Sequence, residues 1–183
     1  FEKLSIRSGS EKIIAIAHNK PHDLSQLKLN KNSIVLVIEA PEKPGNIGAL
    51  YRTAAAAKID AVIIANPKTD FYNPNSIRSS LGGIFILPTA IASSIEVIAY
   101  LKENKITIAT AAINSEAVPY DQFEYTPPCA LVMGTESTGL DQLWLNETNQ
   151  NLMIPMADEV DSLNLSVSAG ILMYECQRKN KRF

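Results

Sequence analysis

The sequence is poor in the residues that mark several common protein classes. Its 183 residues include only two cysteines, Cys129 and Cys176, which lie far apart and lack the paired spacing of a zinc site. Both stand in apolar surroundings, which favours reduced, buried thiols over a disulfide. No apolar run approaches the roughly 18 residues of a membrane span, and no signal peptide is evident at the start of the chain. These absences predict a cytoplasmic protein that does not cross a membrane.

The chain also has no excess of basic residues over acidic ones. The formal net charge is −2, whereas sequence-independent binding of nucleic acid needs a basic surface. Basic residues do concentrate near the two ends, in residues 1–31 and in Arg178–Arg182. Two interpretations stay open for these ends: solvated termini, or a patch that faces RNA.

Apolar runs alternate with helical segments along most of the chain. Ile34–Ile38 is continuously apolar, as expected for a strand buried in a parallel sheet, and the Ala-rich residues 47–57 are typical of a helix. Further strands are expected at residues 13–17, 61–64, 84–87, 106–110, 129–133 and 152–154, and further helices at 76–81, 93–103 and 165–178. This alternation predicts an α/β fold, with a mostly parallel sheet and helices on both faces.

Three segments that follow predicted strands carry the candidate chemistry. The first, Pro44–Ala54, opens the helix after the strand at 34–38. Free backbone N–H groups and the positive helix end would suit a phosphate there. The segment is neither a Walker loop, since it lacks Gly-Lys-Ser/Thr, nor a dinucleotide fingerprint, since the third glycine is missing. Arg52 within it is either a functional cation or a solvated helix residue.

The other two segments are Gly134–Leu140 and Ile154–Asn164. Glycines in the former allow the backbone to approach a ligand, and Glu136 could bind hydroxyls or amines or cap a helix. In the latter, apolar side chains beside exposed backbone groups suit a flat heterocycle, while Ser162 and Asn164 offer polar contacts or helix caps. The acidic residues of this segment lack clustered histidines and octahedral spacing, so no metal is expected.

In this order, the three segments resemble the SpoU/TrmH-type RNA 2′-O-methyltransferases of the SPOUT class. The family pattern is Asn-x-Gly-x-x-x-Arg-Thr-Ala, Gly-x-Glu-x-x-Gly and Ile-Pro-Met…Ser-Leu-Asn, and the resemblance covers about Ile34 to Arg178. Two positions depart from the family: Lys43 replaces a usual Asp, and a usual Gly is missing near Lys58. The matching residues are Asn46, Gly48, Arg52, Thr53, Ala54, Gly134, Glu136, Gly139, Ile154, Pro155, Met156, Ser162, Leu163 and Asn164.

The resemblance implies the SPOUT fold, in which the C-terminal part of the sheet forms a deep trefoil knot. It also implies a homodimer, with the knotted region and the terminal helix in the interface. S-adenosylmethionine would be the cofactor. The resemblance assigns Gly134, Ile154, Met156 and Leu163 to cofactor binding, and Arg52, Asn46, Glu136, Ser162 and Asn164 to the catalytic centre.

The implied reaction transfers a methyl group from S-adenosylmethionine to a ribose 2′-OH of RNA. Residues 73–82 look more like the ribosomal-RNA branch of the family than the transfer-RNA branch. A ribosomal RNA nucleotide, with guanosine favoured, is therefore the expected substrate, and tRNA is the alternative. Residues 1–31 look like the tail of a truncated N-terminal substrate-binding domain with its linker, and residues 32–183 like the SPOUT catalytic domain.

The role of Arg52 is the weak point of this assignment. The family uses this arginine to take the proton from the 2′-OH, yet a guanidinium with a pKa above about 12 is a poor base. Our hypothesis is that Arg52 clamps an RNA phosphate and stabilises the developing alkoxide. Two other classes of function stay open: a non-catalytic RNA-binding or ribosome-assembly module on the same fold, and a Rossmann-type small-molecule enzyme with a nucleotide cofactor.

Overall fold

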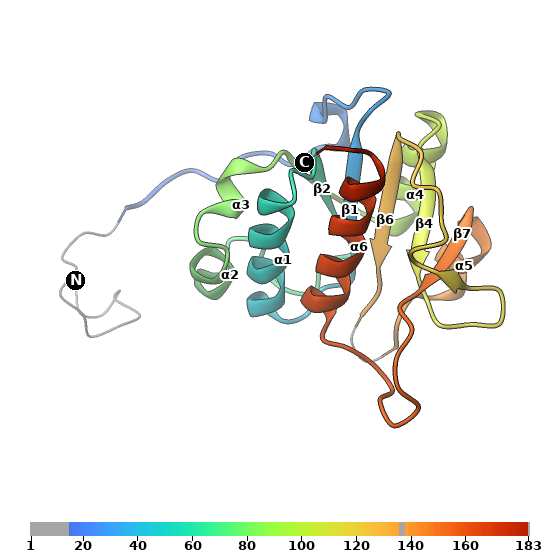
Figure 1. The fold of residues 1–183 in the computed structure, drawn as a ribbon. Coiled ribbons are helices and arrows are strands. Elements are labelled where there is room, and N and C mark those ends of the chain that lie inside the picture. The colour runs from blue at the N-terminus through green and yellow to red at the C-terminus, as the bar shows by residue number, and fades with distance from the viewer. Residues whose placement is uncertain (1–14, 136–137, 183) are drawn as a thin grey trace.

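A single parallel sheet forms the centre of the molecule. The computed structural model describes residues 15–135 and 138–182, and its seven strands pair in the order β3-β2-β1-β6-β4-β7-β5 (Figure 1). All of the pairings are parallel. The strands are β1 (Ile34–Glu39), β2 (Ala61–Ala65), β3 (Thr89–Ala92), β4 (Thr107–Ala111), β5 (Val118–Pro119), β6 (Cys129–Met133) and β7 (Gln150–Met153). The predicted parallel α/β sheet is confirmed.

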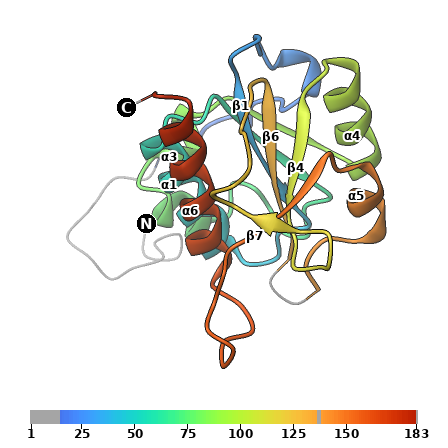
Figure 2. The same ribbon diagram turned by 45° about the vertical axis from the view of Figure 1, so that its right-hand side comes forward.

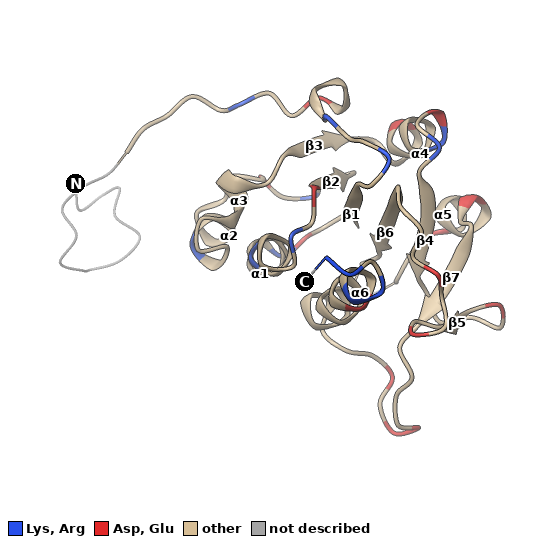
Figure 3. Cartoon of the chain, turned by 45° about the horizontal axis from the view of Figure 1, so that its top comes forward, with Lys and Arg blue, Asp and Glu red and all other residues tan. Residues whose placement is uncertain are grey.

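Helices cover both faces of this sheet, as the alternating pattern predicted. Helix α1 packs against α2, α3 and α6 on one face, whereas α4 and α5 lie on the other (Figure 2 and Figure 3). Within the described residues, none of the helices combines the length and the apolar character needed to cross a membrane. The helices are α1 (Pro44–Ala56), α2 (Pro74–Ser79), α3 (Gly83–Ile86), α4 (Ser94–Glu103), α5 (Gln142–Glu147) and α6 (Leu165–Lys179), preceded by the short 3₁₀ helix η1 (Leu24–Gln26).

The central strand β1 explains why its sequence is continuously apolar. Successive side chains of a strand point to opposite faces, and both faces of β1 are covered. Ile34, Leu36 and Ile38 belong to the core beneath α1 and α6. Val35 and Val37 belong to the core beneath α4 and α5. Every residue of β1 is therefore buried.

Residues 84–86 belong to helix α3 and the extended Leu87 follows it, so the strand predicted at 84–87 is wrong. Helix α3 follows Gly82, whose φ is 90°, and β3 begins only after Pro88. A Cβ at Gly83 would lie 2.9 Å from the carbonyl oxygen of Tyr51, so this glycine lets α3 pack directly on the backbone of α1. A run of four apolar residues fits a strand or a buried helix, and the contact with α1 favours the helix.

The N-terminal strand prediction also fails. Ala15–Ala17 form no strand, while residues 13–14 lie outside the described residues. The segment that follows is attached to the sheet edge at His22. Its carbonyl oxygen accepts a hydrogen bond from Ile91 N in β3 (2.7 Å), and its Nε2 lies 2.9 Å from the hydroxyl of Tyr72. Residues 15–17 are exposed and lie before this point of attachment to the sheet.

Two short elements occupy stretches without a predicted element. Strand β5, which contains Pro119, lies at the edge of the sheet, where a missing N–H is tolerated. Helix α5 begins after Asp141, whose carboxylate accepts a hydrogen bond from Trp144 N (3.2 Å). The Trp144 side chain is fully buried, so this six-residue helix is held by tertiary packing.

The two cysteines are free and buried, as predicted, and the fold brings them together. Cys129 in β6 and Cys176 in α6 have their Sγ atoms 3.9 Å apart. The hydrogen bond between the two sulfurs and the burial of Cys176 both raise the pKa of the Cys176 thiol.

This raised pKa predicts a loss of stability at alkaline pH. Above about pH 8.5, the ordinary pKa of a thiol, the unfolded chain releases the Cys176 proton while the folded chain retains it. The free energy of unfolding should then fall by up to about 1.4 kcal/mol per pH unit. Urea unfolding at several pH values measures this slope, and Cys176→Ala should reduce it. Native thiols that react with a thiol reagent as fast as free cysteine would contradict the prediction.

Candidate active site

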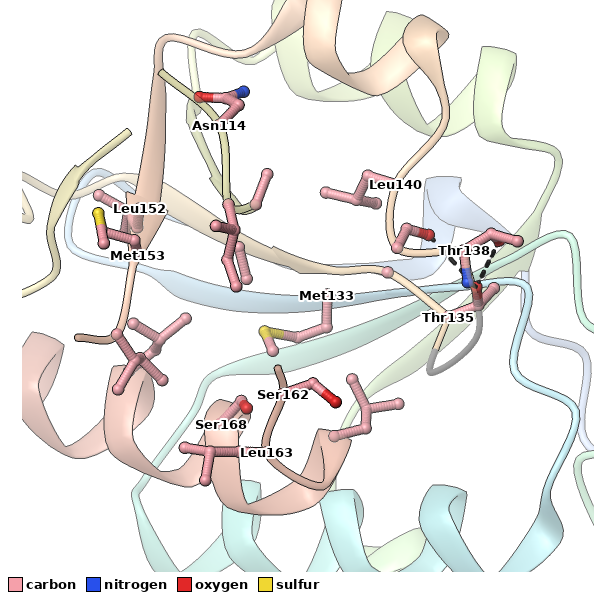
Figure 4. A pocket seen from close by; sticks show the side chains of 18 of the residues that line it. Asn114, Met133, Thr135, Thr138, Leu140, Leu152, Met153, Ser162, Leu163 and Ser168 are labelled. Atoms are coloured by element: carbon pink, nitrogen blue, oxygen red, sulfur yellow. Dashed lines mark hydrogen bonds between the residues drawn. The ribbon is translucent and has the colours of Figure 1, made fainter. Parts of the chain in front are cut away.

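A cavity of about 370 Å³ lies at the carboxyl ends of three neighbouring strands, β6, β4 and β7. Ligands of open α/β sheets bind at this end of the strands. Figure 4 shows Asn114, Met133 and Ser162 around the cavity, with Thr135 and Thr138 at one end of it. Helices α5 and α6 complete the wall through Leu145, Leu165, Ser168 and Leu172. Most of the lining side chains are apolar.

The segment after β6 forms one wall of the cavity. Thr135 and Gly139 exchange two backbone hydrogen bonds, from Thr135 N to Gly139 O (2.9 Å) and from Gly139 N to Thr135 O (3.1 Å). The hydroxyl of Thr135 also accepts from Thr138 N (3.1 Å). A Cβ at Gly134 would lie only 2.3 Å from the carbonyl carbon of Gly139. Only glycine at position 134 permits this close return of the backbone.

All four residues predicted to bind the cofactor line the cavity. Gly134 contributes from the end of β6, Ile154 and Met156 follow β7, and Leu163 precedes α6. Residues far apart in the sequence therefore meet at one site. Ser162, which was assigned to the catalytic set, lines the same cavity.

Asn164 caps helix α6. Its Oδ1 accepts hydrogen bonds from the backbone N of Ser166 (2.9 Å) and from the Ser166 hydroxyl (2.6 Å). The residue is exposed and directly follows the cavity residue Leu163. The sequence left open whether Asn164 caps a helix or contacts a ligand, and the first of these roles is observed.

Asn46 lies in a second, smaller cleft of about 70 Å³. This cleft is also lined by Glu39 and Lys43. Thr135 and Leu165 line both hollows, so the small cleft adjoins the large cavity. The predicted catalytic residue Asn46 therefore lies next to the cavity that is lined by the residues predicted to bind the cofactor.

Arg52 lines neither hollow. Its side chain is exposed on α1 and makes no hydrogen bond or ion pair with the described part of the chain. Side chains of a helix lean toward its N-terminus, which for α1 is the end that carries Asn46. Arg52 thus lies on the same helix as Asn46 but outside both hollows. The remaining catalytic candidate, Glu136, lies outside the described residues.

The sequence did not predict the contribution of the segment after β4. Ala111–Asn114 line the cavity although no motif marks them. Their only local signal is their position after the strand predicted at 106–110. That signal identifies site residues only once β4 is known to lie between β6 and β7. Among residues 15–135 and 138–182, His, Cys, Asp and Glu form no group of three that could hold a metal ion.

Comparison with known proteins identifies relatives along most of the chain. The 23S rRNA (guanosine(2553)-2′-O)-methyltransferase RlmP of Bacillus subtilis is 32% identical over 174 residues, which cover 95% of this chain and 68% of the relative. The 23S rRNA (uridine(2479)-2′-O)-methyltransferase of Streptomyces viridochromogenes is 29% identical over 91% of this chain and 60% of its own length. The chain thus spans only about two thirds of these relatives.

Solved structures of RNA methyltransferases also resemble this chain. The SpoU methyltransferase AviRb from Streptomyces viridochromogenes, in complex with AdoMet, superposes with a TM-score of 0.82 at 27% identity, covering 90% of this chain and 67% of that one. The AdoMet-bound rRNA methyltransferase from Sinorhizobium meliloti has a TM-score of 0.83 at 27% identity, with 87% and 61% covered. The family model of the SpoU rRNA Methylase family matches residues 33–174. The chain therefore belongs to the SpoU rRNA methylase family.

Proposed function

We propose that this protein binds S-adenosylmethionine in the 370 Å³ cavity and transfers its methyl group to a ribose 2′-OH of ribosomal RNA. The observation that carries the proposal is the meeting of Gly134, Ile154, Met156 and Leu163 in one cavity at the carboxyl ends of the strands. Two structural relatives hold AdoMet, and relatives by sequence methylate guanosine or uridine of 23S rRNA. Guanosine is favoured because it is the target of the Bacillus subtilis relative.

The cavity suits such a cofactor in size and in chemistry. Its volume lies within the range of about 300–1,000 Å³ that small-molecule sites occupy. Apolar side chains such as Leu140 and Ile154 can pack against an adenine ring, and the backbone near Gly134 can approach it closely because that residue has no Cβ. Ser162 and Ser168 supply hydroxyls on the α6 side. When bound, S-adenosylmethionine supplies a methyl group already activated on a sulfonium.

The residues of this chain would then align the acceptor and exclude water. Alignment in a closed site supplies much of the acceleration of such transfers. Asn46, in the adjoining cleft, would orient the acceptor ribose. Arg52 would bind the neighbouring RNA phosphate through its planar fork and stabilise the alkoxide as the 2′-oxygen loses its proton.

We further propose a homodimer in which a second copy covers the face formed by α1 and α6. These helices pack together, and they leave Val167 of α6 and Arg52 of α1 exposed. A second copy on this face would enclose Arg52 next to a cofactor site. The C-terminal trefoil knot, involving the path from β7 to α6, is part of the same proposal.

The cytoplasm remains the proposed location. Cys129 and Cys176 lie close enough to interact and are both free, which fits a reducing compartment. For the domain organisation, we propose that residues 32–183 form the catalytic domain and that residues 1–31 are the tail of an N-terminal substrate-binding domain with its linker. The attachment of His22 to β3 supports a linker that is held against the catalytic domain at this point.

Calorimetric titration with S-adenosylhomocysteine tests the cofactor site. We expect saturable binding of about one ligand per chain and no heat with NAD, because the chain lacks a dinucleotide fingerprint. Binding of NAD in preference to S-adenosylhomocysteine would contradict the proposal and favour a small-molecule enzyme. Binding of S-adenosylhomocysteine without methylation of any RNA would favour the non-catalytic RNA-binding module.

A further inference from the structure

The carboxylate of Glu39 forms the centre of a buried hydrogen-bond network that the proposed reaction does not use. Glu39 is the last residue of β1 and is only 6% exposed. Its Oε2 accepts hydrogen bonds from the Ser94 hydroxyl (2.5 Å) and from Trp144 Nε1 (2.8 Å). Its Oε1 accepts from Asn66 Nδ2 (3.3 Å). All three donors are neutral, and each comes from a different segment.

A carboxylate is the one side chain of this size that can satisfy three converging donors. It accepts through both oxygens and donates nothing. An amide in its place would present an N–H₂ group to at least one of these donors. A buried charge is costly unless its hydrogen bonds are complete. Glu39 therefore fixes the starts of α4 and α5 and the end of β2 relative to β1.

One of these three connections leads to the cofactor cavity. Trp144 lies in α5, directly before Leu145, which lines the cavity. The same helix begins at the end of the segment that carries Gly134 and Thr135, and Leu140 at that end is also a cavity residue. The indole hydrogen bond thus connects the wall of the cavity to the end of β1.

Glu39 also reaches the acceptor side of the site. It lines the small cleft together with Asn46, and Thr135 lines both this cleft and the large cavity. Glu39 lines only the small cleft, which adjoins the large cavity at Thr135 and Leu165. A residue in this position can set the distance between the cofactor wall and the acceptor cleft.

We infer that Glu39 is a positioning residue that holds the cofactor wall in place through Trp144. This inference rests on the proposed cofactor and adds a residue that none of the sequence motifs includes. The other two donors, Ser94 and Asn66, anchor α4 and the end of β2, which contribute nothing to the cavity lining. The role of Glu39 in cofactor binding therefore depends on the indole donor.

The test compares Glu39→Gln and Trp144→Phe with Ser94→Ala as the matched control. Trp144→Phe removes the indole donor, Glu39→Gln replaces one acceptor oxygen of the network with a donor, and Ser94→Ala removes a donor that leaves the connection to α5 in place. We expect Glu39→Gln and Trp144→Phe each to weaken S-adenosylhomocysteine binding by about tenfold, the value of one good hydrogen bond. Ser94→Ala should lower the melting temperature while leaving the affinity within about twofold.

The double variant Glu39→Gln/Trp144→Phe tests whether Glu39 acts on the cavity through Trp144. If Glu39 acts through Trp144, the two losses of affinity should not add. Trp144 is the only tryptophan, so its fluorescence in Glu39→Gln reports directly on whether the indole has shifted. A wild-type emission spectrum in this variant, or equal loss of affinity in Ser94→Ala, would overturn the inference.

The same titrations separate this inference from the proposed function. Wild-type protein that fails to bind S-adenosylhomocysteine would overturn the cofactor assignment and the role of Glu39 together. Wild-type binding together with unchanged affinity in folded Glu39→Gln and Trp144→Phe variants would overturn the role of Glu39 alone.

Discussion

Replacement of Gly134 by alanine should abolish measurable binding of S-adenosylhomocysteine. The added Cβ would lie 2.3 Å from the carbonyl carbon of Gly139, 2.5 Å from its oxygen and 2.6 Å from Leu140 N. These are backbone atoms, held in place by the paired hydrogen bonds between Thr135 and Gly139. The only relief is to open this segment, which forms a wall of the cavity. We expect a loss of at least about 100-fold in affinity, because several contacts of the order of 1 kcal/mol are displaced together.

Gly170→Ala is the matched control for this substitution. Gly170 lies in α6, and a Cβ there would meet only Cγ2 of Thr53 at 3.5 Å, an ordinary contact. Alanine in a helix interior is favoured over glycine by about 1 kcal/mol, so this variant should be at least as stable as the wild type and bind the ligand normally. Calorimetry and thermal melting measure both variants. Normal binding by a folded Gly134→Ala protein would mean that this segment does not shape the cofactor site.

Replacement of Arg52 by lysine should reduce methyl transfer by about 100-fold or more, in the range found when a transition-state donor is removed. Lysine retains the charge but loses the planar fork that binds phosphate through two hydrogen bonds. Arg52 lines neither the cavity nor the cleft, so binding of S-adenosylhomocysteine should be unchanged. The effect should therefore be confined to turnover.

Incorporation of labelled methyl groups into 23S rRNA transcribed in vitro measures this turnover. Arg178→Lys is the control, because Arg178 is an exposed arginine that pairs with Glu175 on α6. Near-full activity of Arg52→Lys would refute both the phosphate clamp and the stabilisation of the alkoxide. Loss of cofactor binding in the same variant would instead place Arg52 in the structure of the cofactor site.

The strongest sequence predictions concerned segments whose local pattern allows a single interpretation. The long apolar run before Glu39 and the capped helix after Ser93 were predicted within a residue or two, because a continuous apolar strand and a capping box act locally. The short apolar run at 84–87 was misassigned because the contact between Gly83 and α1 decides whether this run forms a helix or a strand. Helix α5 was missed because burial of Trp144, rather than helix propensity, holds it in place.

By itself, the sequence determined the α/β class, the family and the cavity residues Gly134, Ile154, Met156 and Leu163, since these depend on motif order and on positions at strand ends. Only the tertiary structure decided which strand ends meet. Strand β6 inserts between β1 and β4, and β7 lies beyond β4. Strand order arises from long-range packing that leaves no trace in local periodicity. The order brings Ala111–Asn114 into the cavity, places Asn46 in the adjoining cleft and leaves Arg52 outside both. It also brings Glu39 and Trp144, 105 residues apart in the chain, within hydrogen-bonding distance.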